Sequence, residues 1–243
     1  AKFKAIPDNY KKLTAQEIAV ANNNPSVSPY MPQQEKGVKP ACALAYELYA
    51  DGNLSADRKQ YQIKFKAGNT VFGNNALGAP FHVYAYNKGV QVKSYTVTAG
   101  AELQDGWPLA ANGKYDLHVY GPNGFYRAFA GDINDARLKA QLKYEFEKGG
   151  SNVLTGNLIL SLYNVGSAPL TVQIKDNAYH NPAQSTLIQG SSQEIITLNL
   201  GNSAGWYDIS VTVDGNNTFV KKFAGHIDTG KHSFTDPLMG GTV

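Results

Sequence analysis

The best-known chemical pattern in this sequence is the segment 201–205, Gly-Asn-Ser-Ala-Gly, which matches G-x-S-x-G. In hydrolases this pattern places a strained nucleophilic serine on a sharp turn between a strand and a helix. Here an alternating segment, Trp206 to Val213, follows and predicts a second strand where the helix should be. We therefore expect a polar turn around Ser203, and we assign no catalytic residue to this chain.

Six further side chains are of metal-binding types: His82, His118, His180, His226, His232 and Cys42. None of the histidines has the H-x-x-x-H or H-E-x-x-H spacing, and none has a cysteine partner. We expect no metal site and no other cofactor, with a zinc site assembled from distant strands as the open alternative. Cys42 belongs to no nucleophile motif and is interpreted as a small buried residue. A single cysteine fits a cytosolic protein, and equally an exported one that does not rely on disulfides.

The composition favours strands and turns. The chain has 243 residues, of which 42% are hydrophobic, with 15 Tyr, 10 Phe and 24 Gly. Tyr, Phe, Val and Thr suit strands, and Gly suits turns. The net charge of +3 comes from dispersed lysines with only 3 arginines, so we expect no nucleic-acid partner. No apolar run is long enough for a spanning helix, and no signal peptide is visible.

The feature that organises the chain is a repeat. The segment Gly205 to Ile227 and the segment Gly113 to Ile133 share Gly, Tyr-Asp, an alternating run, a turn and Phe-x-x-x-Phe-Ala-Gly-x-Ile. An Ala-Pro pair before a strand (at 79–80 and at 168–169) is a second anchor. Short alternating segments with a turn about every ten residues predict an all-β fold of two tandem antiparallel β-sandwiches, Ig-like, at 41–136 and 137–243.

Residues 1–40 differ from both repeats and are rich in proline and asparagine. Leu13 to Ala21 could form a short helix, and Thr14 with Glu17 has capping-box spacing. Residues 22–40 predict an extended linker, because proline breaks both helices and strand ladders.

The two repeats differ on one set of outward-facing positions. In the second copy these positions are polar, as in Thr171, Gln173 and Lys175 and then Ser210 and Thr212. In the first copy they are His82, Tyr84, Tyr86, His118 and Tyr120. Such an aromatic face typically marks an interface or binding face. Alternatives are that a loop of the same unit covers it or that the register is wrong by one residue; otherwise the face docks another domain, a ligand or a membrane.

Four segments carry a resemblance to a known family. They are Pro-Ala-x-Ala-Leu-x-Tyr-Glu-Leu at 40–48, Trp-Tyr-Asp-Ile-Ser-Val at 206–211, Phe-Ala-Gly at 129–131 and 223–225, and Asp-Pro-x-Met at 236–239. Over about residues 36–243 the chain resembles the C-terminal region of bacterial phosphocholine-preferring phospholipases C. One departure is Gly-Lys-Tyr at 113–115, where the second copy has Gly-Trp-Tyr.

The resemblance implies a secreted or periplasmic enzyme whose nucleophile and metal ligands lie in an N-terminal α/β domain of the alkaline-phosphatase-like type. Residues 1–40 would then be the leader or linker from the end of that catalytic domain. The enzyme would hydrolyse phosphatidylcholine or sphingomyelin to phosphocholine and a lipid. The two sandwiches would be non-catalytic, bracing the catalytic domain or helping it to engage a lipid surface or a helper protein.

Two other roles are compatible with the sequence. The chain could be a stand-alone carbohydrate- or lipid-binding module, with Trp107, Trp206 and the tyrosines stacking on a sugar or lying at a membrane surface. It could also be a purely structural, adhesin-type tandem.

Overall fold

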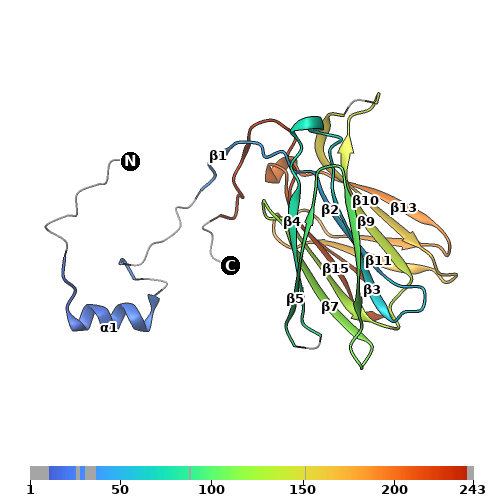
Figure 1. The fold of residues 1–243 in the computed structure, drawn as a ribbon, viewed down its shortest axis with the longest axis horizontal. Coiled ribbons are helices and arrows are strands. Elements are labelled where there is room, and N and C mark those ends of the chain that lie inside the picture. Colours follow the sequence, from blue (N-terminus) through green and yellow to red (C-terminus); the bar gives the residue numbers. More distant parts are fainter. Residues whose placement is uncertain (1–10, 26–27, 31–36, 88, 151, 240–243) are drawn as a thin grey trace. The chain divides into compact units, whose positions relative to one another are not determined.

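The computed structural model describes residues 11–25, 28–30, 37–87, 89–150 and 152–239, which belong to two compact units, Ala1–Gly37 with Leu238–Val243 and Val38–Pro237 (Figure 1). The first unit contains helix α1 (Ala15–Asn23), two residues later than predicted. The predicted capping box is confirmed: the Thr14 hydroxyl accepts from the Glu17 N–H, and the Glu17 carboxylate accepts from the Thr14 N–H. Much of the predicted linker, residues 26–27 and 31–36, lies outside the described residues.

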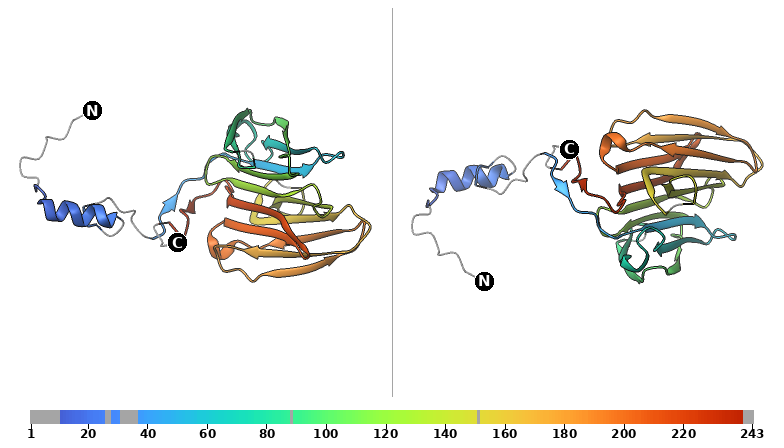
Figure 2. Two further views of the ribbon diagram at one scale, coloured as in Figure 1. Left: turned by 90° about the horizontal axis from the view of Figure 1, so that it is seen from below. Right: turned by 90° about the horizontal axis from the view of Figure 1, so that it is seen from above.

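The second unit consists of two β-sandwiches, as predicted (Figure 2). Each has seven strands within the described residues. The first is built from β2 (Leu48–Leu54), β3 (Gln60–Ala67), β4 (Ala79–Ala85), β5 (Gln91–Val97), β6 (Glu102–Pro108), β7 (Lys114–Tyr120) and β8 (Tyr126–Asp132). The second is built from β9 (Leu138–Phe146), β10 (Leu154–Asn164), β11 (Leu170–Asp176), β12 (Gln184–Ile188), β13 (Gln193–Leu198), β14 (Trp206–Val213) and β15 (Asn216–His226). The short strands β1 (Pro40–Ala41) and β16 (Ser233–Phe234) pair with each other.

The sandwiches are joined through one continuous sheet, which the sequence did not predict. Eight antiparallel strands run in the order β12-β11-β14-β15-β8-β7-β4-β5, and β15 and β8 make the junction. Two separate three-stranded sheets, β2-β3-β6 and β13-β10-β9, cover its inner face. In the first sandwich β4, β5, β7 and β8 therefore share one sheet. In the second sandwich the equivalent strands β11, β12, β14 and β15 do the same.

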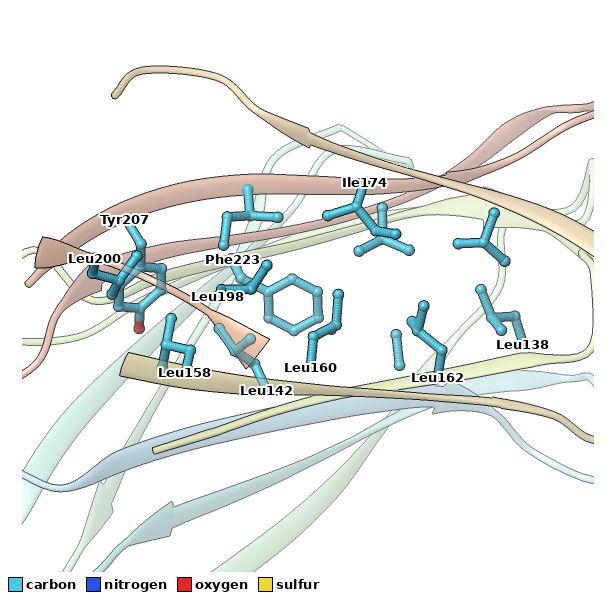
Figure 3. Close-up of a cluster of buried hydrophobic side chains, with 14 of the residues drawn as sticks. Leu138, Leu142, Leu158, Leu160, Leu162, Ile174, Leu198, Leu200, Tyr207 and Phe223 are labelled. Atoms are coloured by element: carbon cyan, nitrogen blue, oxygen red, sulfur yellow. The ribbon is translucent and has the colours of Figure 1, made fainter. Parts of the chain in front are cut away.

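Alternation along the strands builds two separate cores. In the first sandwich Phe65, Phe81 and Phe129 are fully buried, in a cluster of their own. In the second, Leu160 and Phe223 lie at the centre of a cluster that both of its sheets supply (Figure 3). Burial of every second residue of a strand is what a two-layer antiparallel sandwich requires.

The repeated hairpin motif has a packing explanation. Its tyrosine and its glycine are cross-strand partners in both copies, Tyr115 with Gly131 and Tyr207 with Gly225. A Cβ on Gly131 would lie 2.6 Å from the Tyr115 hydroxyl oxygen, and one on Gly225 would lie 2.9 Å from that of Tyr207. The glycine therefore makes room for the ring opposite it, so the motif is structural.

Strand β2 lies later than the segment Ala43 to Ala50 that the sequence predicts as the first strand: it begins at Leu48 and continues through Gly52 to Leu54. The glycine belongs to the strand because its missing side chain leaves space for a core ring. A Cβ on Gly52 would lie 2.3 Å from an edge carbon of the Tyr61 ring.

The junction between the sandwiches has a local two-fold arrangement. Arg127 and Lys221 are equivalent in the repeat, each two residues after the motif's first phenylalanine. Across the β8–β15 junction Arg127 lies opposite Phe223, and Lys221 lies opposite Phe129. Each cation is thus paired with the equivalent phenylalanine of the other sandwich.

Both cations at the junction are buried, with exposed fractions of 2% for Arg127 and 1% for Lys221. The Arg127 guanidinium donates to the Ala224 carbonyl (2.9 Å) and the Tyr207 hydroxyl (3.1 Å), both in the second sandwich. The Lys221 ammonium donates to the Gly52 carbonyl (2.7 Å) in the first sandwich. Buried charges are tolerated only when hydrogen-bonded, so these contacts bind the two sandwiches reciprocally.

The buried ammonium should make stability depend on pH. Desolvation lowers the pKa of Lys221 from 10.5 to about 8. Between these values the unfolded chain binds a proton that the folded chain does not, so stability rises with pH in this window. Relative to a Lys221→Met variant, the wild-type free energy of unfolding should increase by about 1.4 kcal/mol per pH unit from about pH 8.5 to about pH 10.

Urea unfolding at several pH values measures this difference, because the subtraction removes the tyrosines and other shared groups. The matched control is Lys222→Met, one residue further along β15, whose side chain is exposed. A wild-type-minus-Lys221→Met difference that stays constant over the window would contradict the assignment.

Candidate functional site

The outer face of the eight-stranded sheet carries a cluster of aromatic side chains in the first sandwich only. We name it the aromatic patch, and its members are His82, Tyr84, Tyr86, His118, Tyr120 and Tyr126. Five of these six are the residues that the sequence predicted for an interface. The inward residues of the same strands, such as Phe81, Val83 and Leu117, are buried in the core, so the predicted register is the observed one.

The patch is held together by a chain of ring contacts. Tyr84 meets Tyr120 edge-on at 5.5 Å between ring centroids, and Tyr86 meets His118 at 5.0 Å. Tyr120 in turn lies 5.1 Å from Tyr126. Edge-to-face and tilted pairs at these distances are favourable, so the rings form one ordered surface.

Tyr126 is not among the residues predicted from the sequence for the aromatic face, and the structure places His82 at its edge. Tyr126 directly follows the motif's first phenylalanine and lies opposite Tyr120 in the β7–β8 hairpin, a register signal that could have revealed it. His82 is on the same face, opposite Tyr120 on β4, but its Nδ1 lies 2.9 Å from the Ser94 hydroxyl. His82 therefore forms the border of the patch.

Hydrogen bonds orient the centre of the patch. His118 Nε2 lies 3.0 Å from the Asp116 carboxylate, and His118 Nδ1 lies 2.8 Å from the Tyr126 hydroxyl. The carboxylate can only accept, so Nε2 carries the proton and Nδ1 accepts from the phenol. Burial, with Tyr120 and the Asp116 charge, raises the pKa of Tyr126 to about 12. The phenol therefore stays a donor at neutral pH.

No loop within the described residues covers the patch. Tyr86 is 45% exposed and Tyr120 is 41% exposed. At the positions equivalent to Tyr86 and Tyr120 the second sandwich has Lys175 and Thr212. The first sandwich thus presents large aromatic rings to solvent where its copy presents polar side chains.

The G-x-S-x-G segment forms the turn that was predicted. Residues Gly201–Ser203 make one 3₁₀ turn between strands, and Ala204 takes a left-handed backbone conformation. The Ser203 hydroxyl is buried and donates to the carbonyl oxygens of Leu200 and Trp206. It closes the turn and has no histidine partner.

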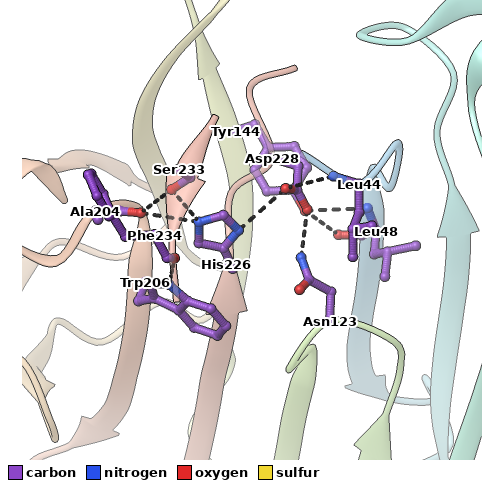
Figure 4. A network of polar contacts seen from close by, with 10 residues as sticks. All are labelled: Leu44, Leu48, Asn123, Tyr144, Ala204, Trp206, His226, Asp228, Ser233 and Phe234. Carbon is purple, nitrogen blue, oxygen red and sulfur yellow. Dashed lines mark hydrogen bonds and ion pairs between the residues drawn. The ribbon is translucent and has the colours of Figure 1, made fainter. Parts of the chain in front are cut away.

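A different serine, histidine and aspartate do come together near β16 (Figure 4). The Ser233 hydroxyl oxygen lies 3.1 Å from His226 Nε2, and His226 Nδ1 lies 3.5 Å from an Asp228 carboxylate oxygen. Asp228 also accepts from the Leu44 N–H and from the Asn123 amide. Sequence reasoning did not connect these residues, because no known spacing motif contains them.

The geometry of this trio is that of a structural bridge. Ser233 donates to the Ala204 carbonyl at 3.1 Å, and His226 Nε2 faces the same oxygen at 3.1 Å. A carbonyl accepts only, so Nε2 carries a proton and cannot act as the base for Ser233. The trio therefore ties β15, the turn before β14 and β16 together.

Several other candidate residues have structural surroundings. Trp107 is 3% exposed, and the Trp206 ring lies tilted against His226 and donates to the Phe234 carbonyl, so neither is a free stacking platform. Cys42 is exposed, so the prediction that it is buried was wrong. Among the described residues no group of three His, Cys, Asp or Glu side chains could hold a metal ion, and no helix could cross a membrane.

Fold and surface together define a tandem β-sandwich module with an aromatic patch on one half. The family model described as "Bacterial phospholipase C, C-terminal domain" matches twice, at residues 40–132 and 138–226, which coincide with the two sandwiches. The chain belongs to the family of bacterial phospholipase C C-terminal domains.

The curated relatives of this chain are also phospholipases C. A non-hemolytic phospholipase C of Pseudomonas aeruginosa is 33% identical over 248 residues, covering 98% of this chain and 34% of that protein. A non-hemolytic phospholipase C of Burkholderia pseudomallei is 37% identical over 227 residues, covering 90% of this chain and 31% of that protein. A hemolytic phospholipase C of Pseudomonas aeruginosa is 32% identical, covering 86% and 30%. The chain thus spans about a third of the length of these relatives.

If the patch is a surface and not part of the core, its rings should be removable. In the isolated chain we expect Tyr86→Ser combined with Tyr120→Ser to lower the free energy of unfolding by about 2 kcal/mol or less, because both rings are nearly half exposed. Phe129→Ala, which empties a fully buried site, should cost about 3–5 kcal/mol. Denaturant unfolding distinguishes the two, and a double-variant loss as large as that of Phe129→Ala would make the patch part of the core.

Proposed function

We propose that this chain is the non-catalytic C-terminal region of a secreted phospholipase C, and that the aromatic patch docks the catalytic domain of the same enzyme. The enzyme would hydrolyse phosphatidylcholine or sphingomyelin to phosphocholine and a lipid. The chain itself would require no cofactor. Its contribution would be to brace the catalytic domain.

The observation that carries the docking proposal is the contrast between the repeats. The first sandwich keeps half-exposed rings, Tyr86 and Tyr120, where the second has polar side chains, Lys175 and Thr212. Exposed aromatic clusters of this kind are typical of buried centres of interfaces. The relatives named above are about three times longer than this chain, so each has a large further part available as partner.

The charge of the patch supports a protein partner. Its polar borders are Asp116 and Lys114 on β7 and Lys222 on β15. Mixed charges around an apolar centre match the polar rim and apolar core of a domain interface. A helper protein and a lipid surface are the two other partners that the test must separate.

The non-catalytic assignment is tested on the isolated chain with a chromogenic phosphocholine ester and a short-chain carboxylic ester. We expect turnover equal to the buffer blank for wild type and for Ser233→Ala alike, because the Ser233 hydroxyl is committed to a backbone carbonyl. Turnover of the phosphocholine ester above the blank would overturn the assignment. Carboxylic ester turnover lost in Ser233→Ala would instead show that the bridge is a catalytic triad.

The docking assignment is tested in the whole enzyme with Tyr86→Ser combined with Tyr120→Ser. We expect the catalytic part to unfold at a lower temperature and to become separable from this region by limited proteolysis. The matched control is Lys175→Ser with Thr212→Ser, the equivalent positions of the second sandwich, which should behave as wild type.

Three outcomes would contradict docking of the catalytic domain. The first is a variant with wild-type thermal unfolding and proteolysis. The second is a selective loss of binding to phosphatidylcholine vesicles, which would make the patch a lipid-engaging surface. The third is loss of complex formation with a separate helper protein while the enzyme alone is unaffected.

A further inference from the structure

A hollow of the Val38–Pro237 unit lies away from the aromatic patch, on the opposite side of the molecule's sheets. Strands β2 and β9 are the facing edges of the two three-stranded sheets, and they are not paired with each other. They meet where the Tyr144 hydroxyl lies 3.3 Å from both the N–H and the carbonyl oxygen of Leu48. A groove of ≈ 600 Å³ opens along the outer face of β2, β3 and β6 and is walled by β9. Small-molecule sites have volumes of this order.

The walls of this groove carry polar side chains that the protein leaves unpaired. Gln62 on β3, Gln104 on β6 and Gln141 on β9 line it. Among the described residues these three amide groups make no hydrogen bond, and neither does the Asp51 carboxylate on β2. Each amide offers donors and an acceptor, and the carboxylate offers acceptors. A ligand with many hydroxyl groups, each both donor and acceptor, would satisfy all of them.

The groove has no net charge to select an ion. Three carboxylates and three ammonium groups line it: Glu47, Asp51, Glu102, Lys64, Lys66 and Lys143. Lys64 and Lys66 both pair with Glu102, the latter at 3.8 Å, so these lysines are not free to bind an anion. Burial raises the pKa of the Asp51 carboxyl, which weakens its attraction for a cation. A neutral ligand fits this balance best.

One end of the groove is aromatic. Tyr49 and Phe146, both partly buried, line it, and the Tyr49 ring packs 5.2 Å from that of Tyr144. The Tyr49 hydroxyl donates to the Glu47 carboxylate, which fixes the ring. A fixed aromatic edge beside amides and a carboxylate combines apolar contact with hydroxyl recognition.

We propose that the groove between β2-β3-β6 and β9 is a binding site for a neutral oligosaccharide, free or as the headgroup of a glycolipid. Gln104 and Gln141 bind sugar hydroxyls from opposite walls, Asp51 accepts from a third hydroxyl, and Phe146 contacts the apolar side of a sugar ring. The site is independent of the aromatic patch, and it uses residues of both sandwiches. It therefore exists only because the repeats are joined through one sheet.

Isothermal titration of the 243-residue chain with maltopentaose, mannopentaose and chitopentaose tests the proposal. We expect saturable binding of at least one, with a Kd of about 1 mM or tighter. Gln104→Ala combined with Gln141→Ala should weaken it by about tenfold or more, because each loses hydrogen bonds to the ligand. Both amides are unpaired within the described residues, so the variant should unfold like wild type. The matched control is Gln193→Ala on β13, an exposed glutamine outside the groove, which should leave binding unchanged.

A second arm separates the two sources of the sugar. Flotation with phosphatidylcholine vesicles, with and without a neutral glycolipid, shows whether the headgroup is also bound. Binding only to glycolipid vesicles, lost in the double glutamine variant, supports the glycolipid form. The proposal is overturned if neither the oligosaccharides nor the glycolipid bind, if plain vesicles bind equally well, or if the double variant binds like wild type.

Discussion

The structure depends on two buried cations at the junction of its sandwiches. Arg127 and Lys221 are taken out of water, and a buried charge without hydrogen bonds costs several kcal/mol. Each cation donates hydrogen bonds to the opposite sandwich. Arg127 donates to the Ala224 carbonyl and the Tyr207 hydroxyl, and Lys221 donates to the Gly52 carbonyl. Separating the sandwiches would strand both charges, so the two repeats form one unit. The continuous sheet, the facing edges of β2 and β9 and the groove between them all follow from this junction.

The two repeats share the residues that the fold requires and differ in residues on the outer face of the sheet. Both copies keep the tyrosine opposite the motif glycine, because the ring occupies the space that a Cβ would fill. On the outer face, where no packing partner constrains the side chains, the copies diverge into rings around Tyr120 and hydroxyl groups around Thr212. The trio of Ser233, His226 and Asp228 belongs to the structural side of this division, since its proton donors are committed to fixed acceptors.

The two surfaces that remain face opposite sides of the sheets and have different chemistry. The aromatic patch is an array of contacting rings suited to a large partner, whereas the groove is a polar site suited to a small one. Under the two proposals, one accessory region would hold a catalytic domain on one side and a sugar on the other. This arrangement needs both repeats, because the groove takes one wall from each.

The amino-acid sequence alone determined the all-β class, the two repeats, the inward and outward faces of β4 and β7, the Thr14 cap and the membership of the aromatic patch up to Tyr120. These features are local, because the alternation of apolar and polar residues, the capping box and the repeated motif each depend on residues close together in the sequence. Tertiary structure alone decided that β8 pairs with β15, that Arg127 and Lys221 are buried, that Gly52 lies within a strand, and that Cys42 is exposed. Those outcomes depend on contacts between residues far apart in the chain, and no local pattern distinguishes a cation in solvent from one whose partners lie on another strand.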